Sequence, residues 1–272
     1  QVIDFLMSFY YVYKKIMTQE YASNFEKFVN IVNRLRRECP WDREQTHKSI
    51  RHSLIEETYE VVEAIDDNDN DELKKELGDI LLHVVFHASI AEQSNEFTLN
   101  DVIDGITEKL IRRHPHVFGE VEVSGSKQVI SNWEKIKLTE GRNSLMEGVP
   151  KELPALLRAH RLQDKASKVG FDWEKKEQAW KKVDEEMHEL HRAIESGKQA
   201  EVESEFGDLL FAMVNYSRFI NVNPEIALRH TVEKFITRFQ YIERKLSDMG
   251  KDIHSSSLEE MDKLWEEAKT KS

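Results

Sequence analysis

Apolar residues recur every three or four positions along most of the chain, which is the spacing of amphipathic α-helices. Near the N-terminus, for example, Phe25, Phe28 and Val32 follow this pattern. Asn, Asp, Gly and Pro residues interrupt it at intervals and indicate loops between the helices. The pattern predicts helices over residues 24–37, 49–66, 71–93, 99–113, 126–138, 154–168, 174–196, 200–221, 224–248 and 257–270.

The order of these predicted helices repeats once along the chain. A Cys39-Pro40-Trp41-Asp42 loop precedes the second predicted helix, and Gly170-Phe171-Asp172-Trp173 holds the corresponding place in the second half. The repeat predicts an all-α fold, a tandem repeat of two helical bundle domains. We expect an N-terminal extension over residues 1–20, an N-terminal domain over 21–140, a linker over 141–153 and a C-terminal domain over 154–272.

One acidic pattern occurs in both halves with the same internal spacing, and an apolar stretch follows each copy. A single pair of glutamates on a charged helix usually marks a solvated face. A longer pattern that repeats within one chain favours a common function instead. Its members are Glu57, Glu60, Glu76 and Asp79 in the first half and Glu186, Glu189, Glu205 and Asp208 in the second.

The two acidic segments of each half lie on neighbouring predicted helices. Residues three apart share a helix face, and a short loop makes the two helices antiparallel neighbours, so the four carboxylates can converge. Converging carboxylates repel one another unless a cation neutralises them. Oxygen-only ligands suit Mg²⁺, or alternatively Mn²⁺. Gly78 and Gly207, each one residue before the aspartate, indicate either a close approach by a helix or ligand or tight helix packing.

Basic residues near the second acidic set could hold a polyphosphate. Lys182 precedes Glu186 by one helical turn, and Lys234 and Arg238 are also one turn apart. Lys and Arg donors beside a metal can neutralise the charge that builds up during cleavage. The first half has Ser53 in place of Lys182, which favours the second half as the main site.

Composition narrows the choice of partners. The chain has 272 residues with 39 basic and 51 acidic side chains, a balance that disfavours general nucleic-acid and membrane-surface binding. Cys39 is the only cysteine, which is typical of a reducing, cytoplasmic setting. No apolar run reaches the ~20 residues of a membrane span. Residues 1–16 lack signal-peptide features, so we expect an upstream extension without chemistry, before a more natural start at Met17.

The motifs together resemble those of the MazG family of nucleoside triphosphate pyrophosphohydrolases, within the all-α NTP pyrophosphatase superfamily. The resemblance covers about residues 20 to 270. The motifs that carry it are Cys39-Pro40-Trp41-Asp42, Leu54-Ile55-Glu56-Glu57-Thr58-Tyr59-Glu60, Glu76-Leu77-Gly78-Asp79, Arg112-Arg113-His114-Pro115-His116-Val117-Phe118, Lys165-Ala166-Ser167-Lys168-Val169-Gly170-Phe171-Asp172-Trp173 and Glu205-Phe206-Gly207-Asp208-Leu209-Leu210-Phe211.

The resemblance implies Mg²⁺-dependent hydrolysis of NTP or dNTP to the monophosphate and pyrophosphate, in house-cleaning or in regulation of nucleotide pools. It also implies a homodimer with its main active site in the C-terminal domain. The implied metal ligands are Glu186, Glu189, Glu205 and Asp208, and the implied catalytic and substrate contacts are Lys182, Lys234, Arg238 and Trp265. We expect Glu189 to accept a proton from water. Glu57, Glu60, Glu76 and Asp79 form a second possible metal site.

Alternatives remain open from the sequence. Glu185-x-x-His188 fits an oxygen-handling di-metal bundle once, whereas a His83–His87 pair one turn apart is better explained by packing or hydrogen bonding. A non-enzymatic helical regulator or scaffold would carry the acidic residues as surface charge only. Trp265 is either a core anchor or a nucleobase contact.

Overall fold

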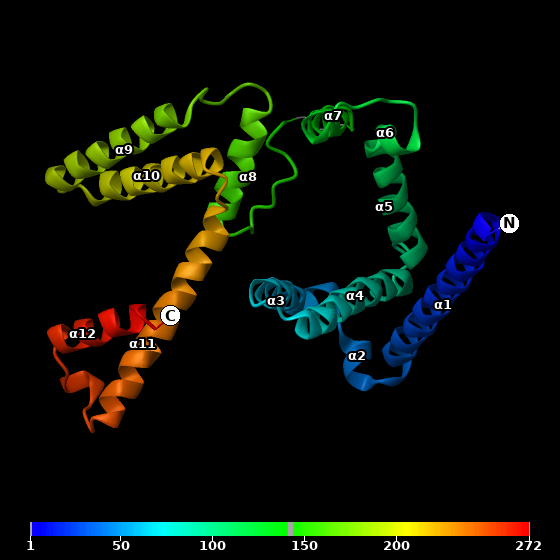
Figure 1. Cartoon of the computed structure of the whole chain (residues 1–272), viewed down its shortest axis with the longest axis horizontal. Helices are drawn as coiled ribbons and strands as arrows, with labels where there is room; N and C mark the ends of the chain where they lie inside the picture. Colours follow the sequence, from blue (N-terminus) through cyan, green and yellow to red (C-terminus); the bar gives the residue numbers. More distant parts are fainter. Residues whose placement is uncertain (1, 141–143, 272) are drawn as a thin grey trace. The chain divides into compact units, whose positions relative to one another are not determined.

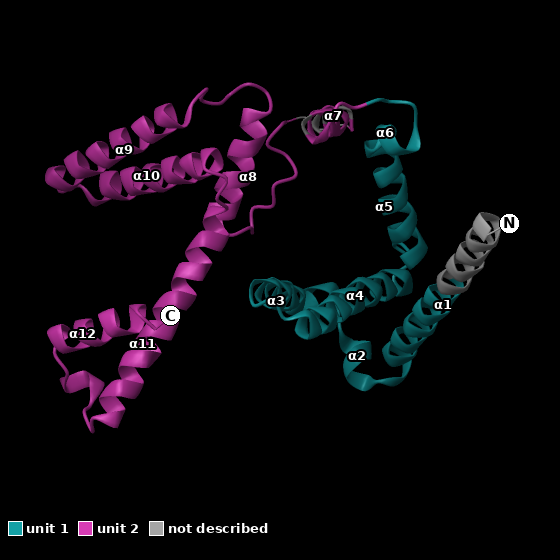
Figure 2. Ribbon diagram, in the orientation of Figure 1, with its two compact units in different colours: residues 1–122 teal, residues 123–272 magenta. Residues whose placement is uncertain are grey.

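The computed structural model describes residues 2–140 and 144–271, without the side chains of residues 2–18, 127, 134, 138 and 139. Over these residues the secondary structure is entirely helical (Figure 1). The chain divides into two compact units, residues 1–122 and 123–272 (Figure 2). The predicted all-α class is therefore confirmed.

Unit 1 is built around α3 and α4, which pack side by side as an antiparallel pair (Figure 1). The turn between them is tight because Asn68 adopts the left-handed conformation, with φ of 57°, and Asp69 then caps α4 by accepting hydrogen bonds from two backbone N–H groups. The elements are α1 (Val2–Glu38), α2 (Pro40–Glu44), α3 (His47–Asp66), α4 (Asn70–Gln93), α5 (Leu99–Arg113) and α6 (Pro115–Phe118).

The core of unit 1 lies where α1, α3 and α4 meet. Val32 from α1, Ile50 from α3 and Val85, Phe86 and Ile90 from α4 are buried together. Burial of this apolar surface anchors the C-terminal halves of α1 and α4 against the start of α3.

Unit 2 repeats the antiparallel pair with α9 and α10 (Figure 1). Gly197, with φ of 68°, ends α9 in the left-handed conformation that glycine adopts without strain. The element α8 packs against α10 and α11, and α12 folds back on α11 over buried Ile242, Leu246 and Leu264. The elements are α7 (Ser126–Thr139), α8 (Ala155–Ser167), α9 (Lys176–Ser196), α10 (Gln199–Phe219), α11 (Pro224–Asp248), the 3-10 turn η1 (Ile253–Ser255) and α12 (Leu258–Lys269).

The observed helices differ from the predicted ones at two places in unit 1, the segment after Cys39 and the first helix. The predicted loop at Pro40 is the short helix α2, because proline is favoured in the first turn of a helix. The first predicted helix, 24–37, is the last part of the much longer α1. The expected lack of chemistry in residues 1–16 concerns side chains outside the described residues.

The predicted domain limits are not decided by the division into units. The predicted linker over residues 141–153 begins in a segment, 141–143, that lies outside the described residues. The boundary between the units falls earlier, between Glu122 and Val123. No described helix is long and apolar enough to cross a membrane.

Candidate active site

Three of the predicted metal ligands of unit 2 meet between α9 and α10. Glu186 projects from α9 and Glu205 and Asp208 from α10, and a carboxylate oxygen of each lies within 4.8 Å of the others. Glu186 is only 6% exposed. Burial raises the pKa of Glu205, and the neighbouring charges of Glu189, Asp208 and Glu186 raise it further. A hard divalent cation relieves this crowding, so the donor set fits Mg²⁺ or Mn²⁺.

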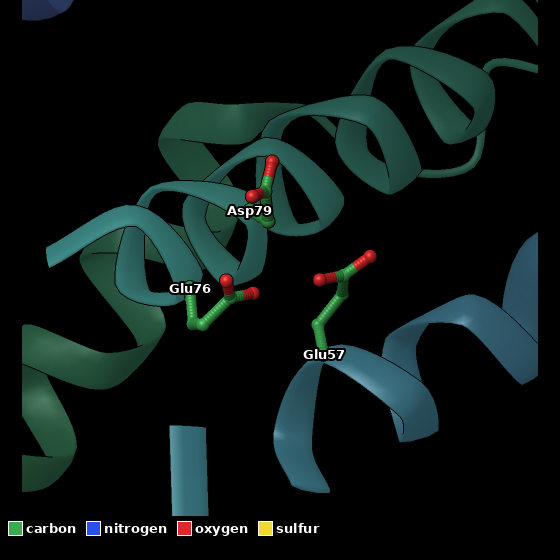
Figure 3. Close-up of side chains that lie close together, drawn as sticks. All are labelled: Glu57, Glu76 and Asp79. Atoms are coloured by element: carbon green, nitrogen blue, oxygen red, sulfur yellow. The ribbon is translucent and has the colours of Figure 1, made fainter. Parts of the chain in front are cut away.

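Unit 1 holds the matching group. Glu57 projects from α3 toward Glu76 and Asp79 on α4 (Figure 3), again with one oxygen of each within 4.8 Å of the others. Glu76 is 5% exposed. Burial, together with the adjacent carboxyl groups of Glu72 and Glu60, raises the pKa of Glu76 to about 7. The repeated sequence pattern therefore corresponds to a repeated structure.

The fourth predicted ligand of each half stands outside its group. Glu60 and Glu189 do not belong to the two sets of converging oxygens found among the described residues. Glu189 instead forms an ion pair with Arg192, at 3.0 Å. The negative charge of Glu189 still contributes to the raised pKa of Glu205. Glu189 therefore interacts electrostatically with the acidic group. Its role as a ligand remains a prediction.

Lys182 distinguishes the two halves. Its Nζ lies 2.7 Å from carboxylate oxygens of both Glu185 and Glu186. Hydrogen bonds to these two carboxylates raise the pKa of Lys182, so the ammonium stays charged beside the acidic group. Ser53, the residue at the corresponding place in α3, has no ammonium to offer.

A cavity of about 640 Å³ adjoins the acidic group of unit 2. Lys182, Glu186 and Asp208 form part of its wall. The rest of the wall is largely apolar and aromatic, and it comes from the segment before α8, from α8 and α10, and from the loop before α9. The lining residues there are Met146, Leu162, Gln163, Ala166, Gly170, Phe171, Asp172, Trp173, Phe211, Ala212, Asn215 and Arg218.

The remaining predicted substrate contacts lie elsewhere in unit 2. Lys234 and Arg238 are on α11 and Trp265 is on α12, and none of the three lines the cavity. The Arg238 guanidinium lies 5.6 Å from the centre of the Trp265 ring. Trp265 also packs against the core of this hairpin. Within one chain, the structure therefore separates these residues from Lys182 and the carboxylates.

Sequence reasoning missed an ion pair that shapes the cavity. Asp172, in the loop before α9, accepts hydrogen bonds from both terminal nitrogens of Arg218 on α10, at 2.6 and 3.3 Å. The pair fixes the loop that carries Phe171 and Trp173 over the cavity. Asp172 stood in a recognised motif, but no sequence pattern pointed to Arg218 as its partner.

The histidines do not support an oxygen-handling di-metal site. The Nδ1 atoms of His47 and His87 lie 2.7 Å apart, and His83 packs beside His87 with ring centres 6.1 Å apart. The sequence favoured packing or hydrogen bonding, and not metal binding, for His83 and His87. His188 bonds the backbone oxygen of Asp184 instead of facing the carboxylates. Among the described residues, no histidine joins either acidic group.

Comparisons with known proteins agree with this geometry. A family model described as the MazG nucleotide pyrophosphohydrolase domain matches residues 45–118 and 174–242, which contain the two helix pairs. The chain is 47% identical to the nucleoside triphosphate pyrophosphohydrolase/pyrophosphatase MazG of Thermotoga maritima, over 90% of this chain and 95% of that protein. It is 40% identical to the nucleoside triphosphate pyrophosphohydrolase of Escherichia coli K12, over 91% of this chain and 97% of that protein.

A solved structure, the crystal structure of a mazG-related protein from Thermotoga maritima, is 28% identical to the chain and covers 42% of it and 98% of its own length, with a TM-score of 0.38. The family model matches both acidic helix pairs. The two relatives extend the similarity over nearly the whole chain. The chain belongs to the MazG nucleotide pyrophosphohydrolase family.

Proposed function

We propose that this protein is a Mg²⁺-dependent nucleoside triphosphate pyrophosphohydrolase whose main active site lies in unit 2. It converts an NTP or dNTP and water to the monophosphate and pyrophosphate. The observation that supports this most is the group of Glu186, Glu205 and Asp208, which converges within 4.8 Å and borders a cavity large enough for a nucleotide. Family membership supplies the reaction class.

The chain's own residues have distinct roles in this proposal. Glu186, Glu205 and Asp208 hold the cation, with Glu189 as an additional ligand. When bound, Mg²⁺ supplies positive charge to the phosphate oxygens. Lys182 adds a fixed positive charge on the same wall. Hydrolysis adds one water across the α–β anhydride, and Glu189 accepts the proton that the attacking water loses.

We also propose that the protein functions as a homodimer. An apolar stripe of α10, Phe206, Leu210 and Met213, is 53%, 43% and 43% exposed. The equivalent stripe of α4, Leu77, Leu81 and Val84, is exposed to a similar degree. Burying such stripes is favourable. A Cβ added at Gly78 or Gly207 would meet no atom within 4 Å, so the space beside each stripe is open for a helix of a second chain.

The homodimer also explains the position of Lys234, Arg238 and Trp265. In its own chain, α11 runs from α8 away from the α9–α10 pair (Figure 1). We propose that these three residues contact the substrate bound at the acidic group of the second copy. The acidic group of unit 1 is a second, weaker metal site in this scheme, because Ser53 leaves it without the ammonium that Lys182 provides.

The proposal is tested by separating the products of each common NTP and dNTP after incubation with the protein and Mg²⁺. Pyrophosphate and the monophosphate are the expected products. A nucleoside diphosphate with orthophosphate would contradict the assigned bond. No turnover with any nucleotide, in protein that binds Mg²⁺, would favour the regulator or scaffold.

A further inference from the structure

A turn from the segment before α8 forms part of the cavity wall in unit 2. The turn spans residues 144–148, and we call it the strap. The backbone N–H of Glu147 donates a hydrogen bond of 3.2 Å to the backbone oxygen of Ser144. Gly148 has a φ of 76°, which glycine adopts without strain. These features shape the turn but join it to no other element, so the strap needs a separate attachment to keep a fixed place beside the cavity.

A buried lysine provides that attachment. Lys165 on α8 is only 6% exposed. Its Nζ donates hydrogen bonds of 2.9 Å to the backbone oxygens of both Leu145 and Glu147. Burying an ammonium is costly unless hydrogen bonds compensate for the lost water, so Lys165 and the strap hold each other in place. Leu145 and Glu147 flank Met146, and the backbone on both sides of Met146 is therefore fixed to α8.

Met146 is the residue by which the strap reaches the cavity. It lines the same cavity as Lys182, Glu186 and Asp208. It is 44% exposed, so its side chain has surface that a ligand can cover. A methionine side chain is flexible and adapts its shape to a neighbour. The position of its backbone, which Lys165 holds, therefore decides whether Met146 stands at the cavity or away from it.

We propose that Lys165 is a positioning residue that clasps the strap to α8 and so keeps Met146 against the bound substrate. Lys165 itself is not among the residues that line the cavity, so its effect on turnover passes through Met146. Without the ammonium, the strap loses its attachment to α8 and the cavity loses part of its wall. The inference rests on the proposed function for the identity of the substrate, whereas the clasp itself does not depend on it.

The clasp is tested first without nucleotide, by amide hydrogen exchange and mass spectrometry of the peptide that contains the strap. Lys165→Met keeps the length of the side chain but removes every donor. It should speed exchange in the strap by about tenfold or more and leave α12 unchanged, because the opening is local. Lys165→Arg should retain much of the protection, since a guanidinium also donates to carbonyl oxygens. Lys198→Met, at an exposed position, is the control and should change nothing.

The role in substrate binding is tested by steady-state kinetics with Mg²⁺ and the best substrate of the product screen. Lys165→Met should raise KM roughly tenfold and change kcat by less than about twofold, because the strap contributes equally to binding of the ground state and the transition state. Met146→Ala should raise KM to a similar degree without speeding exchange in the strap. The double variant should have the KM of Met146→Ala, because Lys165 acts through Met146 and the two effects do not add.

The outcomes separate the clasp from the reaction. Unchanged exchange of the strap in Lys165→Met overturns the clasp, whether or not nucleotides are hydrolysed. Faster exchange with an unchanged KM overturns the role in substrate binding, as does a double variant in which the two increases in KM multiply. If Lys165→Met does not fold by circular dichroism, Lys165→Gln replaces it with the same expected directions. Faster exchange in a protein that releases no pyrophosphate from any nucleotide supports the clasp and contradicts the proposed reaction.

Discussion

Lys182 and Glu186 form an ion pair of 2.7 Å along one face of α9, and the equivalent turn of α3 has Ser53 before Glu57. The pair matters because Glu186 is buried, and a buried carboxylate is stabilised by a nearby positive charge. Lys182 thus places a positive charge beside a predicted metal ligand in unit 2 only. The two acidic groups share a geometry but differ in charge.

This difference predicts that the two halves contribute unequally to turnover. Asp208→Ala should lower kcat/KM on the order of 100-fold or more, since even residues that only support a metal ligand are worth roughly 10–100-fold. Asp79→Ala, the matched change in unit 1, should leave most of the activity. Pyrophosphate release is measured for both variants, after circular dichroism confirms their fold. Equal losses would contradict the assignment of the main site to unit 2.

Glu76→Gln should stabilise the metal-free protein, and only at higher pH. The pKa of Glu76 is about 7 in the folded protein against an ordinary value of 4.5. The folded state therefore binds this proton more tightly than the unfolded chain, and stability is lost as the pH rises from about 4.5 through about 7. Glutamine removes that loss because it never ionises.

The measurement is the melting temperature in a chelator at pH 5 and pH 8. The variant should exceed the wild type clearly at pH 8 and by much less at pH 5. Glu92→Gln, at an exposed position near the other end of α4, is a control for removing one negative charge. A difference in melting temperature between variant and wild type that does not grow with pH would show that burial does not raise the pKa of Glu76.

Much of the site follows from helical periodicity alone. Glu57 and Glu76 come together because a three-residue spacing and a short turn constrain two antiparallel helices, and Asn68 makes that turn possible. The same argument applied to Glu186 and Asp208 was sufficient to predict a metal site. The prediction needed only local rules, since each acidic group is formed by two consecutive helices.

Contacts between distant segments could not be predicted in the same way. Arg218 reaches Asp172 across a large separation in sequence, and no periodic pattern records such a pairing. Glu189 pairs with Arg192 on its own helix, although the sequence favoured a role as a fourth ligand. The direction of α11 depends on its packing against α8 and α12, so the separation of Trp265 from the cavity was not visible in the sequence.

Mg²⁺ should stabilise the folded protein through the acidic groups. Binding to the native state raises stability by about 1.4 kcal/mol for each tenfold rise in free Mg²⁺ above the dissociation constant. The melting temperature of the wild type should therefore climb with Mg²⁺ concentration. In a Glu186→Gln/Glu205→Gln variant the increase should fall to the part contributed by unit 1. An increase of equal size in both proteins would refute the ligand assignment in unit 2.

The exposed stripe of α10 should hold the homodimer together. Leu210→Lys places a charge in the centre of the stripe, between Phe206 and Met213, where the proposed partner helix packs. Light scattering should report a dimer for the wild type and a shift toward monomer for the variant. Lys198→Ala, outside the stripe on the exposed turn before α10, should remain dimeric. A monomeric wild type at micromolar concentration would refute the assembly.

Subunit mixing decides whether Lys234 and Arg238 serve the acidic group of a second copy. Asp208→Ala and Lys234→Ala/Arg238→Ala should each be nearly inactive as pure homodimers. When the two are unfolded and refolded together, half of the randomly formed dimers are heterodimers, and each contains one site with both intact carboxylates and intact basic residues. Activity should recover to about a quarter of the wild-type value if the two chains share the site. If the residues act within their own chain, every site in the mixture carries a defect and no activity returns.

Mixing Asp208→Ala with Glu186→Gln is the control, because both changes affect the same acidic group. No exchange of subunits should then restore more than the trace activity of the separate variants.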